Sequence, residues 1–160
     1  MTWRGEKTIQ DRMFACVPYS LPLASVLSYG VSLMQQFPPL RFLFQPLFPI
    51  LFIYSQVPFG LGESVVFLLL FLFVVRNARV PHFIRFNTMQ ALLLQLAIFL
   101  CDILLQILMP ALGQNLVTET LSNIIFLSTV VACFYSIVQS ILGRYAELPS
   151  ISEAVYTHVR

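Results

Sequence analysis

Four apolar segments, each close to twenty residues long, restrict what this chain can fold into. They cover about residues 13–35, 58–76, 87–110 and 118–143. A helix of about 20 apolar residues crosses the roughly 30 Å of hydrocarbon in a bilayer. Only 10% of the residues are charged, and the mean hydropathy is +0.83. The sequence therefore predicts an all-α integral membrane protein, built as a four-helix bundle.

A fifth apolar segment, at about residues 38–57, differs from the other four. It contains Pro38, Pro39, Pro46 and Pro49. A proline inside a helix removes a backbone hydrogen bond and kinks or breaks the helix. We expect an extra short helical segment here, interfacial or re-entrant, rather than a fifth span.

The basic residues predict how the spans are oriented, because short loops on the inner side of a membrane are enriched in Lys and Arg. With four spans and a cytoplasmic N-terminus, Arg41 is the only one of the nine Lys and Arg residues left outside. A fifth span at 38–57 would instead move Arg76, Arg79 and Arg85 to the outside. We therefore expect both termini to be cytoplasmic or stromal. The predicted division is an N-terminal segment 1–12, a transmembrane domain 13–145 and a C-terminal tail 146–160.

Small residues recur every four positions in the first and fourth segments, where they allow helices to approach closely. The two ladders are Ser20, Ala24, Ser28 and Ser32, and Ser128, Ala132, Ser136 and Ser140. We expect both ladders to contact other helices. The alternative is that these serines only bond to carbonyls of their own helix.

The third apolar segment carries polar side chains on one face. At about 100° per residue, a single narrow sector holds Thr88, Gln95, Asp102 and Gln106. An acid inside a span is costly and by default indicates function, so this polar seam should face the bundle interior or water. A carboxyl group hydrogen-bonded to the fourth helix is the structural alternative for Asp102. Glu63 and Glu119 are both expected near outer helix ends, Glu63 at a solvated helix start, so neither offers Asp102 a partner at the same depth.

The turn before the third segment reads "VRNARVPHFIRFNTMQA". Pro81 should end the second helix, and Asn87 or Thr88 should cap the third. The arginines Arg76, Arg79 and Arg85 would then meet anionic lipid headgroups at the inner interface. This account leaves Gln90 without a role.

The stretch "HFIRFNTMQALLL" resembles the signature of the Tic20-like family, the twenty-kilodalton Tic subunit of the chloroplast inner-envelope translocon and its cyanobacterial homologues. The similarity covers about residues 12–145, including "RMFACVPYSLPLASVLSYG" and "QFPPLRFLFQPLFPI". The motif positions are Arg76, Asn77, Arg85, Phe86, Asn87, Met89 and Gln90. The resemblance implies four transmembrane helices with both ends cytoplasmic or stromal, in agreement with the charge distribution.

The resemblance also implies a membrane subunit of a protein-import translocon that contributes to a protein-conducting path. Its partners would be membrane lipids, other membrane subunits and an unfolded passenger polypeptide. Plant members carry a transit peptide, whereas "MTWRGEKTIQDR" has mixed charge and lacks that character. We therefore expect a cyanobacterial cell membrane or plastid inner membrane location.

Other function classes are weaker. A small-solute channel or transporter and a non-conducting assembly scaffold both stay open, as does a homo-oligomer. No nucleophile elbow, P-loop or HExxH pattern indicates an enzyme. Cys16, Cys101 and Cys133 lack metal-site spacing, so no metal or cofactor is expected. The scattered arginines do not indicate nucleic-acid binding.

Overall fold

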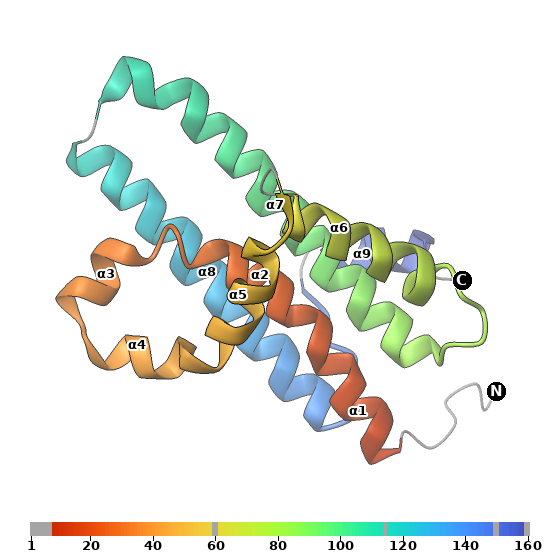
Figure 1. The fold of residues 1–160 in the computed structure, drawn as a ribbon. Coiled ribbons are helices and arrows are strands. Elements are labelled where there is room, and N and C mark those ends of the chain that lie inside the picture. The colour runs from red at the N-terminus through yellow and green to blue at the C-terminus, as the bar shows by residue number, and fades with distance from the viewer. Residues whose placement is uncertain (1–7, 59–60, 114, 149–150, 159–160) are drawn as a thin grey trace.

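The computed structural model describes residues 8–58, 61–113, 115–148 and 151–158, and its regular structure there is entirely helical. The two longest helices, α7 (His82–Leu112) and α8 (Leu116–Ile141), pack against each other as an antiparallel pair (Figure 1). Each is long and apolar enough to cross a membrane. The prediction of an all-α fold is therefore confirmed.

The first predicted span becomes a helical rod followed by a break. The rod consists of α1 (Ile9–Cys16), a 3-10 turn η1 (Val17–Tyr19) and α2 (Ser20–Val26). It begins four residues before the predicted position and packs against both α7 and α8. Residues 27–30 then turn into α3 (Val31–Gln36). Gly30 lies so close to α8 that an added Cβ atom would come within 2.8 Å of Phe126 Cζ.

The proline-rich segment forms short helices rather than one long one. These are α4 (Pro39–Phe44), the 3-10 turn η2 (Gln45–Leu47) and α5 (Phe48–Ser55). A proline occupies the first turn of each of these elements, where a missing backbone N–H removes no helical bond. The prolines thus set the helix starts. The interfacial or re-entrant placement of this segment stays a prediction.

The second predicted span is also short. It contains α6 (Gly62–Leu69) and a π-helix η4 (Leu70–Val75). At about 1.5 Å per residue this helix is roughly 21 Å long, so it runs beside only the first half of α7. Gly62 starts it against α5, where an added Cβ atom would lie 2.8 Å from Tyr54 Cα.

Two apolar clusters hold the helices together. The first lies around Tyr19, Val26 and Phe126, with the Phe44 and Phe126 ring centroids 5.6 Å apart. The second contains Leu21, Val75, Phe86, Met89, Leu92 and Val155. Val155 belongs to the last helix, α9 (Ile151–His158), and is fully buried against the start of α7. The segment following α8 therefore includes a helix docked on the bundle.

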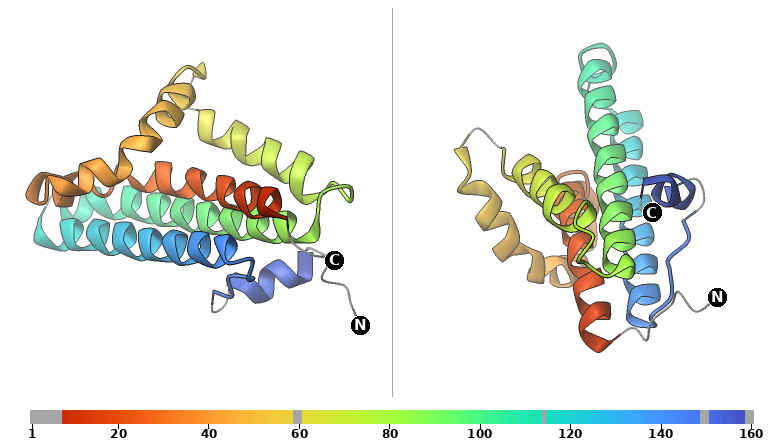
Figure 2. Two further views of the ribbon diagram at one scale, coloured as in Figure 1. Left: turned by 90° about the horizontal axis from the view of Figure 1, so that it is seen from below. Right: turned by 90° about the vertical axis from the view of Figure 1, so that its right-hand side faces the viewer.

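The elements divide between two ends of the molecule (Figure 2). One end, called here the terminal end, holds the start of α1, the 76–81 turn, the end of α8 and helix α9. The opposite end, called here the loop end, holds α3 and the α7–α8 connection. The 76–81 turn and both ends of the chain's described part thus lie together.

Candidate functional site

Two buried amides of α7 connect three helices near the terminal end. Asn87 Oδ1 accepts hydrogen bonds from the Tyr19 hydroxyl at 3.1 Å and the Ser140 hydroxyl at 2.8 Å. Gln90 Nε2 donates to Ser136 Oγ at 3.0 Å. Asn87 and Gln90 are both fully buried. These two motif residues therefore link η1, α7 and α8 through side chains, which gives Gln90 the role that the sequence did not.

The expectation that Asn87 or Thr88 caps the third helix is wrong. The helix already begins at His82, because Pro81 has an extended backbone with ψ of 138° and places the next residue in the first turn. Asn87 and Thr88 consequently lie inside α7. Each bonds to the carbonyl four residues earlier, Asn87 Nδ2 to Phe83 O and Thr88 Oγ1 to Ile84 O, both at 2.8 Å.

The other motif residues build the joint between η4 and α7. Arg85 Nε donates to Val75 O at 2.9 Å, at the C-terminal end of the π-helix. Phe86 packs edge-on to Tyr145 and close to Tyr156, with ring centroids 4.9 and 5.0 Å apart. Met89 is buried in the same apolar cluster as Phe86.

Upstream, the side chain of Asn77 stabilises the turn between η4 and α7. Asn77 Oδ1 accepts from the backbone N–H of Arg79 at 3.0 Å. The side chain of Arg76 is exposed. All seven motif residues thus lie in or next to the η4–α7 joint, and four of them, Phe86, Asn87, Met89 and Gln90, are buried.

Halfway along α7, Gln95 joins a three-helix polar node. The Ser25 hydroxyl of α2 donates to Glu63 Oε2 at 2.6 Å, and its oxygen lies 3.0 Å from Gln95 Oε1. Gln95 Nε2 donates to the same Glu63 oxygen at 3.3 Å. Glu63 lies in the first turn of α6, at a helix start as expected, but its carboxylate is half-buried and bonded to Ser25 and Gln95.

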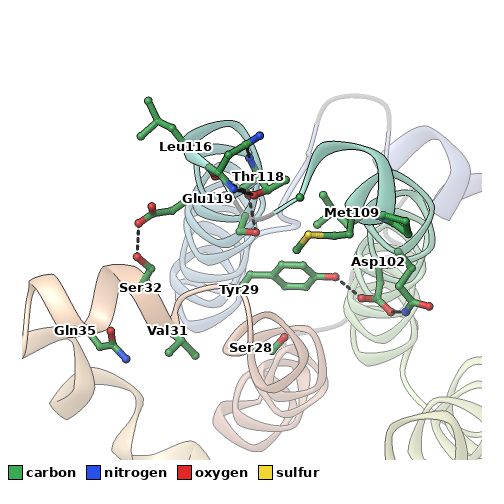
Figure 3. Close-up of a pocket in the computed structure, with 16 residues that line it drawn as sticks. Ser28, Tyr29, Val31, Ser32, Gln35, Asp102, Met109, Leu116, Thr118 and Glu119 are labelled. Atoms are coloured by element: carbon green, nitrogen blue, oxygen red, sulfur yellow. Dashed lines mark hydrogen bonds between the residues drawn. The ribbon is translucent and has the colours of Figure 1, made fainter.

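Asp102, two turns further along α7, is also held by hydrogen bonds. Its two carboxylate oxygens accept from the Tyr29 hydroxyl at 2.8 Å and from Gln106 Nε2 at 2.7 Å. Figure 3 shows the Tyr29 ring reaching from the end of α2 toward Asp102. The acid therefore pairs with a hydroxyl from the turn that follows α2. The structural alternative predicted from the sequence had placed the hydroxyl partner of Asp102 on the fourth helix, α8.

The Asp102 pair forms one wall of a large cavity at the loop end, with a volume of about 1340 Å³. Its walls are the α2–α3 turn, the second half of α7 and the start of α8 (Figure 3). On the opposite wall, the Ser32 hydroxyl donates to Glu119 Oε1. The described residues that line this cavity include two carboxylates, several hydroxyls and amides, and neither Lys nor Arg.

A smaller cavity of about 170 Å³ continues the polar lining toward the middle of the molecule. It shares Ser28, Tyr29 and Asp102 with the loop-end cavity and adds Ser25, Glu63 and Gln95. Three acidic side chains, Glu63, Asp102 and Glu119, therefore lie along the two cavities. Such a lining offers hydrogen bonds to water or to the peptide groups of an extended chain.

The structure brings together Gln95, Asp102 and Gln106 of the predicted seam but separates Thr88 from them. At the level of Thr88, the neighbours of α7 in the groove are α1, η1, η4 and the turn before α7. Thr88 accordingly lines an apolar groove with Phe14 and Leu70, and its hydroxyl remains bonded to its own helix.

The two small-residue ladders divide between contacts with other helices and bonds within their own helix. Ser136 and Ser32 bond to side chains of other helices, and Ala24 is buried. Ser140 lies within hydrogen-bond distance both of Asn87 on α7 and of Ser136 O in its own helix. The hydroxyls of Ser20, Ser28 and Ser128 bond to carbonyls of the same chain segment three or four residues away. Ala132 packs at the edge of the first apolar cluster.

Sequence reasoning missed Ser25, Tyr29 and Glu63 as partners of the seam. Ser25 and Tyr29 are four residues apart and so share a helix face, which was the available signal. The ladder of small residues at Ser20, Ala24 and Ser28 predicted that the adjacent face of this helix would make the contacts. Among the described residues, no three His, Cys, Asp or Glu side chains gather where they could hold a metal ion.

Comparisons with known proteins agree with the sequence motif. The model of the family described as chloroplast import apparatus Tic20-like matches residues 8–155. A Tic20 family protein of Synechocystis sp. is 45% identical over 152 residues, which cover 94% of each chain. The chloroplastic protein TIC 20-II of Arabidopsis thaliana is 33% identical over 90% of this chain and 70% of its own length. The Tic20 family protein Ycf60 of Gracilaria tenuistipitata is also 33% identical, over 92% and 74%.

Proposed function

The chain belongs to the Tic20-like family of the chloroplast import apparatus, and from this premise we propose that it is a multi-pass membrane subunit of a protein-translocation complex. Its four crossings are the α1–α2 rod, the α6–η4 helix, α7 and α8. The segment 38–57 lies at the membrane interface or re-enters it. The proposal rests on the family and on the two long apolar helices, α7 and α8.

The proposed orientation places the terminal end on the cytoplasmic or stromal side. The 76–81 turn, with Arg76 and Arg79, lies at the same end as both ends of the described chain (Figure 2). Lys and Arg concentrate on that side of membrane proteins. The location proposed is a cyanobacterial cell membrane or a plastid inner membrane, with other translocon subunits and lipids as neighbours.

We further propose that the loop-end cavity is the surface that contacts passenger polypeptide. The proposal of passenger contact rests on the polar lining of this cavity. In a chain that is 58% hydrophobic, an open space of about 1340 Å³ is lined by Asp102, Glu119 and several hydroxyls and amides. A polypeptide inside a membrane needs partners for its peptide groups, because lipid provides none. This lining supplies such partners together with water.

Site-specific photocrosslinking in membranes tests the cavity. A photoreactive residue is placed at Gln106 or Gln35, which line the cavity, and a radiolabelled passenger is arrested during translocation. The matched control is Leu104, two positions from Gln106 on α7 and 59% exposed on its apolar surface. We expect passenger adducts from the two cavity positions and none from Leu104. Adducts equal at all three positions, or absent from both cavity positions, would refute passenger contact.

The same experiment separates the translocon role from a scaffold role. A scaffold would yield stable adducts to other membrane subunits and none to passenger. A solute channel would instead show flux in reconstituted vesicles that falls when Asp102 is changed to Asn.

A further inference from the structure

An apolar groove lies at the terminal end, away from the two polar cavities. It has a volume of about 370 Å³, at the lower end of the range for small-ligand sites. Its walls come from α1 and η1 (Phe14, Val17), from η4 (Leu70, Val74) and from the start of α7 (Ile84). Phe14 and Val17 are 62% and 60% exposed, so the groove opens onto the outer surface of the bundle.

The groove runs along the helices rather than across them. On η4 it extends from Val74 to Leu70, and on α7 from Ile84 to Thr88. Four residues of helix correspond to about 6 Å, so the groove leads from the 76–81 turn toward the middle of the molecule. Because the Thr88 hydroxyl donates to Ile84 O, it does not need a hydrogen-bond partner in the groove.

Of the described residues that line this apolar groove, Arg79 alone is charged, and it lies in the turn itself. Within the part of the chain that the structure describes, its guanidinium group makes no hydrogen bond or ion pair, and only its backbone N–H is bonded. Arg76, three residues earlier, is likewise exposed and has no side-chain partner there. The acid on the neighbouring helix, Asp11, is held in the capping box with Thr8.

We propose that this groove binds one anionic glycerophospholipid, with an acyl chain lying between α1 and η4 and the phosphate paired with Arg79. The apolar groove matches the acyl chain of a lipid, and Arg79, whose side chain has no partner among the described residues, matches its phosphate. Arg pairs with phosphate through several N–H groups, and the walls match a hydrocarbon chain. The space is too small for a folded partner. The inference requires the membrane embedding proposed above but not passenger contact, which belongs to the other end of the molecule.

The test uses the full-length protein in phosphatidylcholine nanodiscs that contain a small share of phosphatidylglycerol with a photoreactive acyl chain. Peptide mapping should find the label in segments 14–18, 70–74 and 84–88. Unlabelled phosphatidylglycerol should compete for it. Soluble glycerol phosphate should not compete, because it lacks an acyl chain.

Two variants and two controls separate the parts of the site. Arg79→Gln should lower labelling about fivefold, the factor that one interfacial arginine contributes. Val17→Trp should abolish labelling by filling the groove. Arg41→Gln changes an exposed arginine on α4, and Leu104→Trp enlarges an exposed apolar residue of α7. Both controls should label like the unmodified chain.

Three results would overturn the proposal. The first is uniform labelling of all lipid-facing helices. The second is that Arg79→Gln and Arg41→Gln are labelled to the same extent, or that a photoreactive phosphatidylcholine labels the groove as strongly as phosphatidylglycerol. The third is capture of another polypeptide by a photoreactive residue at position 17 or 74, which would mean that a partner helix fills the groove. None of these results depends on whether passenger reaches the loop-end cavity.

Discussion

Asn87 illustrates how one polar side chain organises an apolar core. Its single carbonyl oxygen serves two hydroxyls from different helices, Tyr19 and Ser140, while its amide nitrogen bonds to Phe83 O within α7. All the side chains involved are buried. Buried hydroxyls that lose their partner cost about 1–3 kcal/mol each, although measured values inside membranes are often lower.

We therefore predict that Asn87→Leu lowers the free energy of unfolding by about 1–2 kcal/mol, because the buried Tyr19 hydroxyl loses its acceptor. The Ser140 hydroxyl loses less, since it can still donate to Ser136 O, 2.8 Å away. The matched control is Asn123→Leu on α8. The side-chain oxygen of Asn123 is buried without a hydrogen-bond partner in the described part of the chain, so this change should be neutral or slightly stabilising. Unfolding by dodecyl sulfate in mixed micelles, followed by circular dichroism, measures both. Equal losses in the two variants would contradict the role of Asn87.

The joint between η4 and α7 is stabilised by a side-chain hydrogen bond to a backbone carbonyl at the end of η4. A π-helix leaves unpaired carbonyl groups at its C-terminal end, as any helix does. Arg85 Nε reaches back from α7 to Val75 O at 2.9 Å. This bond fixes where the second helix ends and how the third begins.

Arg85→Lys keeps the positive charge but loses the directed N–H of the guanidinium group. We expect amide hydrogen exchange in segment 70–76 to accelerate about tenfold, since a hydrogen bond from a charged group contributes roughly 1.5 kcal/mol or more. Arg76→Lys is the control, because the Arg76 side chain has no partner among the described residues. Exchange monitored by mass spectrometry would count against this capping role if both variants behaved alike.

The contact between α5 and α6 depends on the absence of a side chain at Gly62. A Cβ atom there would lie 2.8 Å from Tyr54 Cα, which is backbone and has no room to shift. Gly62→Ala should therefore lower the melting temperature, with a cost of about 1–3 kcal/mol from overpacking. Ser64→Ala, two residues further on an exposed position, should leave it unchanged. A thermal melt of each purified variant distinguishes the two outcomes.

At the level of the complete fold, the structure separates a basic end from an acidic one. Arg76 and Arg79 lie at the terminal end, whereas Asp102 and Glu119 line the loop-end cavity. The proposed four crossings place these ends on opposite sides of the membrane. The proposed orientation can thus be tested directly.

Single cysteines in a variant without Cys16, Cys101 and Cys133 test this orientation with a membrane-impermeant maleimide. Cysteines at Ala78 and Glu147, both exposed at the terminal end, should react from the cytoplasmic or stromal side. A cysteine at Ala111, exposed near the end of α7, should react only from the opposite side. Reaction of Ala78 and Ala111 positions from the same side would exclude an odd number of crossings between them and refute the arrangement.

The sequence predicted the helical class, the approximate positions of α7 and α8, and a family from one motif. Composition and periodicity are sufficient for these, because a span must satisfy its own backbone. The position of Glu63 beside Ser25 and Gln95 was not predictable in this way. It depends on how far α6 extends along α7, and the contact between Gly62 and Tyr54 sets that start. The separation of Thr88 from the other seam residues was not predictable either. It depends on which neighbouring helices pack against that part of α7, and the periodicity of α7 itself does not show this.

The docked α9 also has a consequence for how the molecule is made. Its binding surface, formed by Phe86 and the other members of the second apolar cluster outside α9, comes from helices that precede α9 in the chain. Residues 151–158, however, leave the ribosome after all of these helices, because synthesis runs from the N-terminus. The surface around Phe86 therefore stays uncovered until α9 has been made, and an insertase or chaperone has that interval in which to engage the unfinished protein.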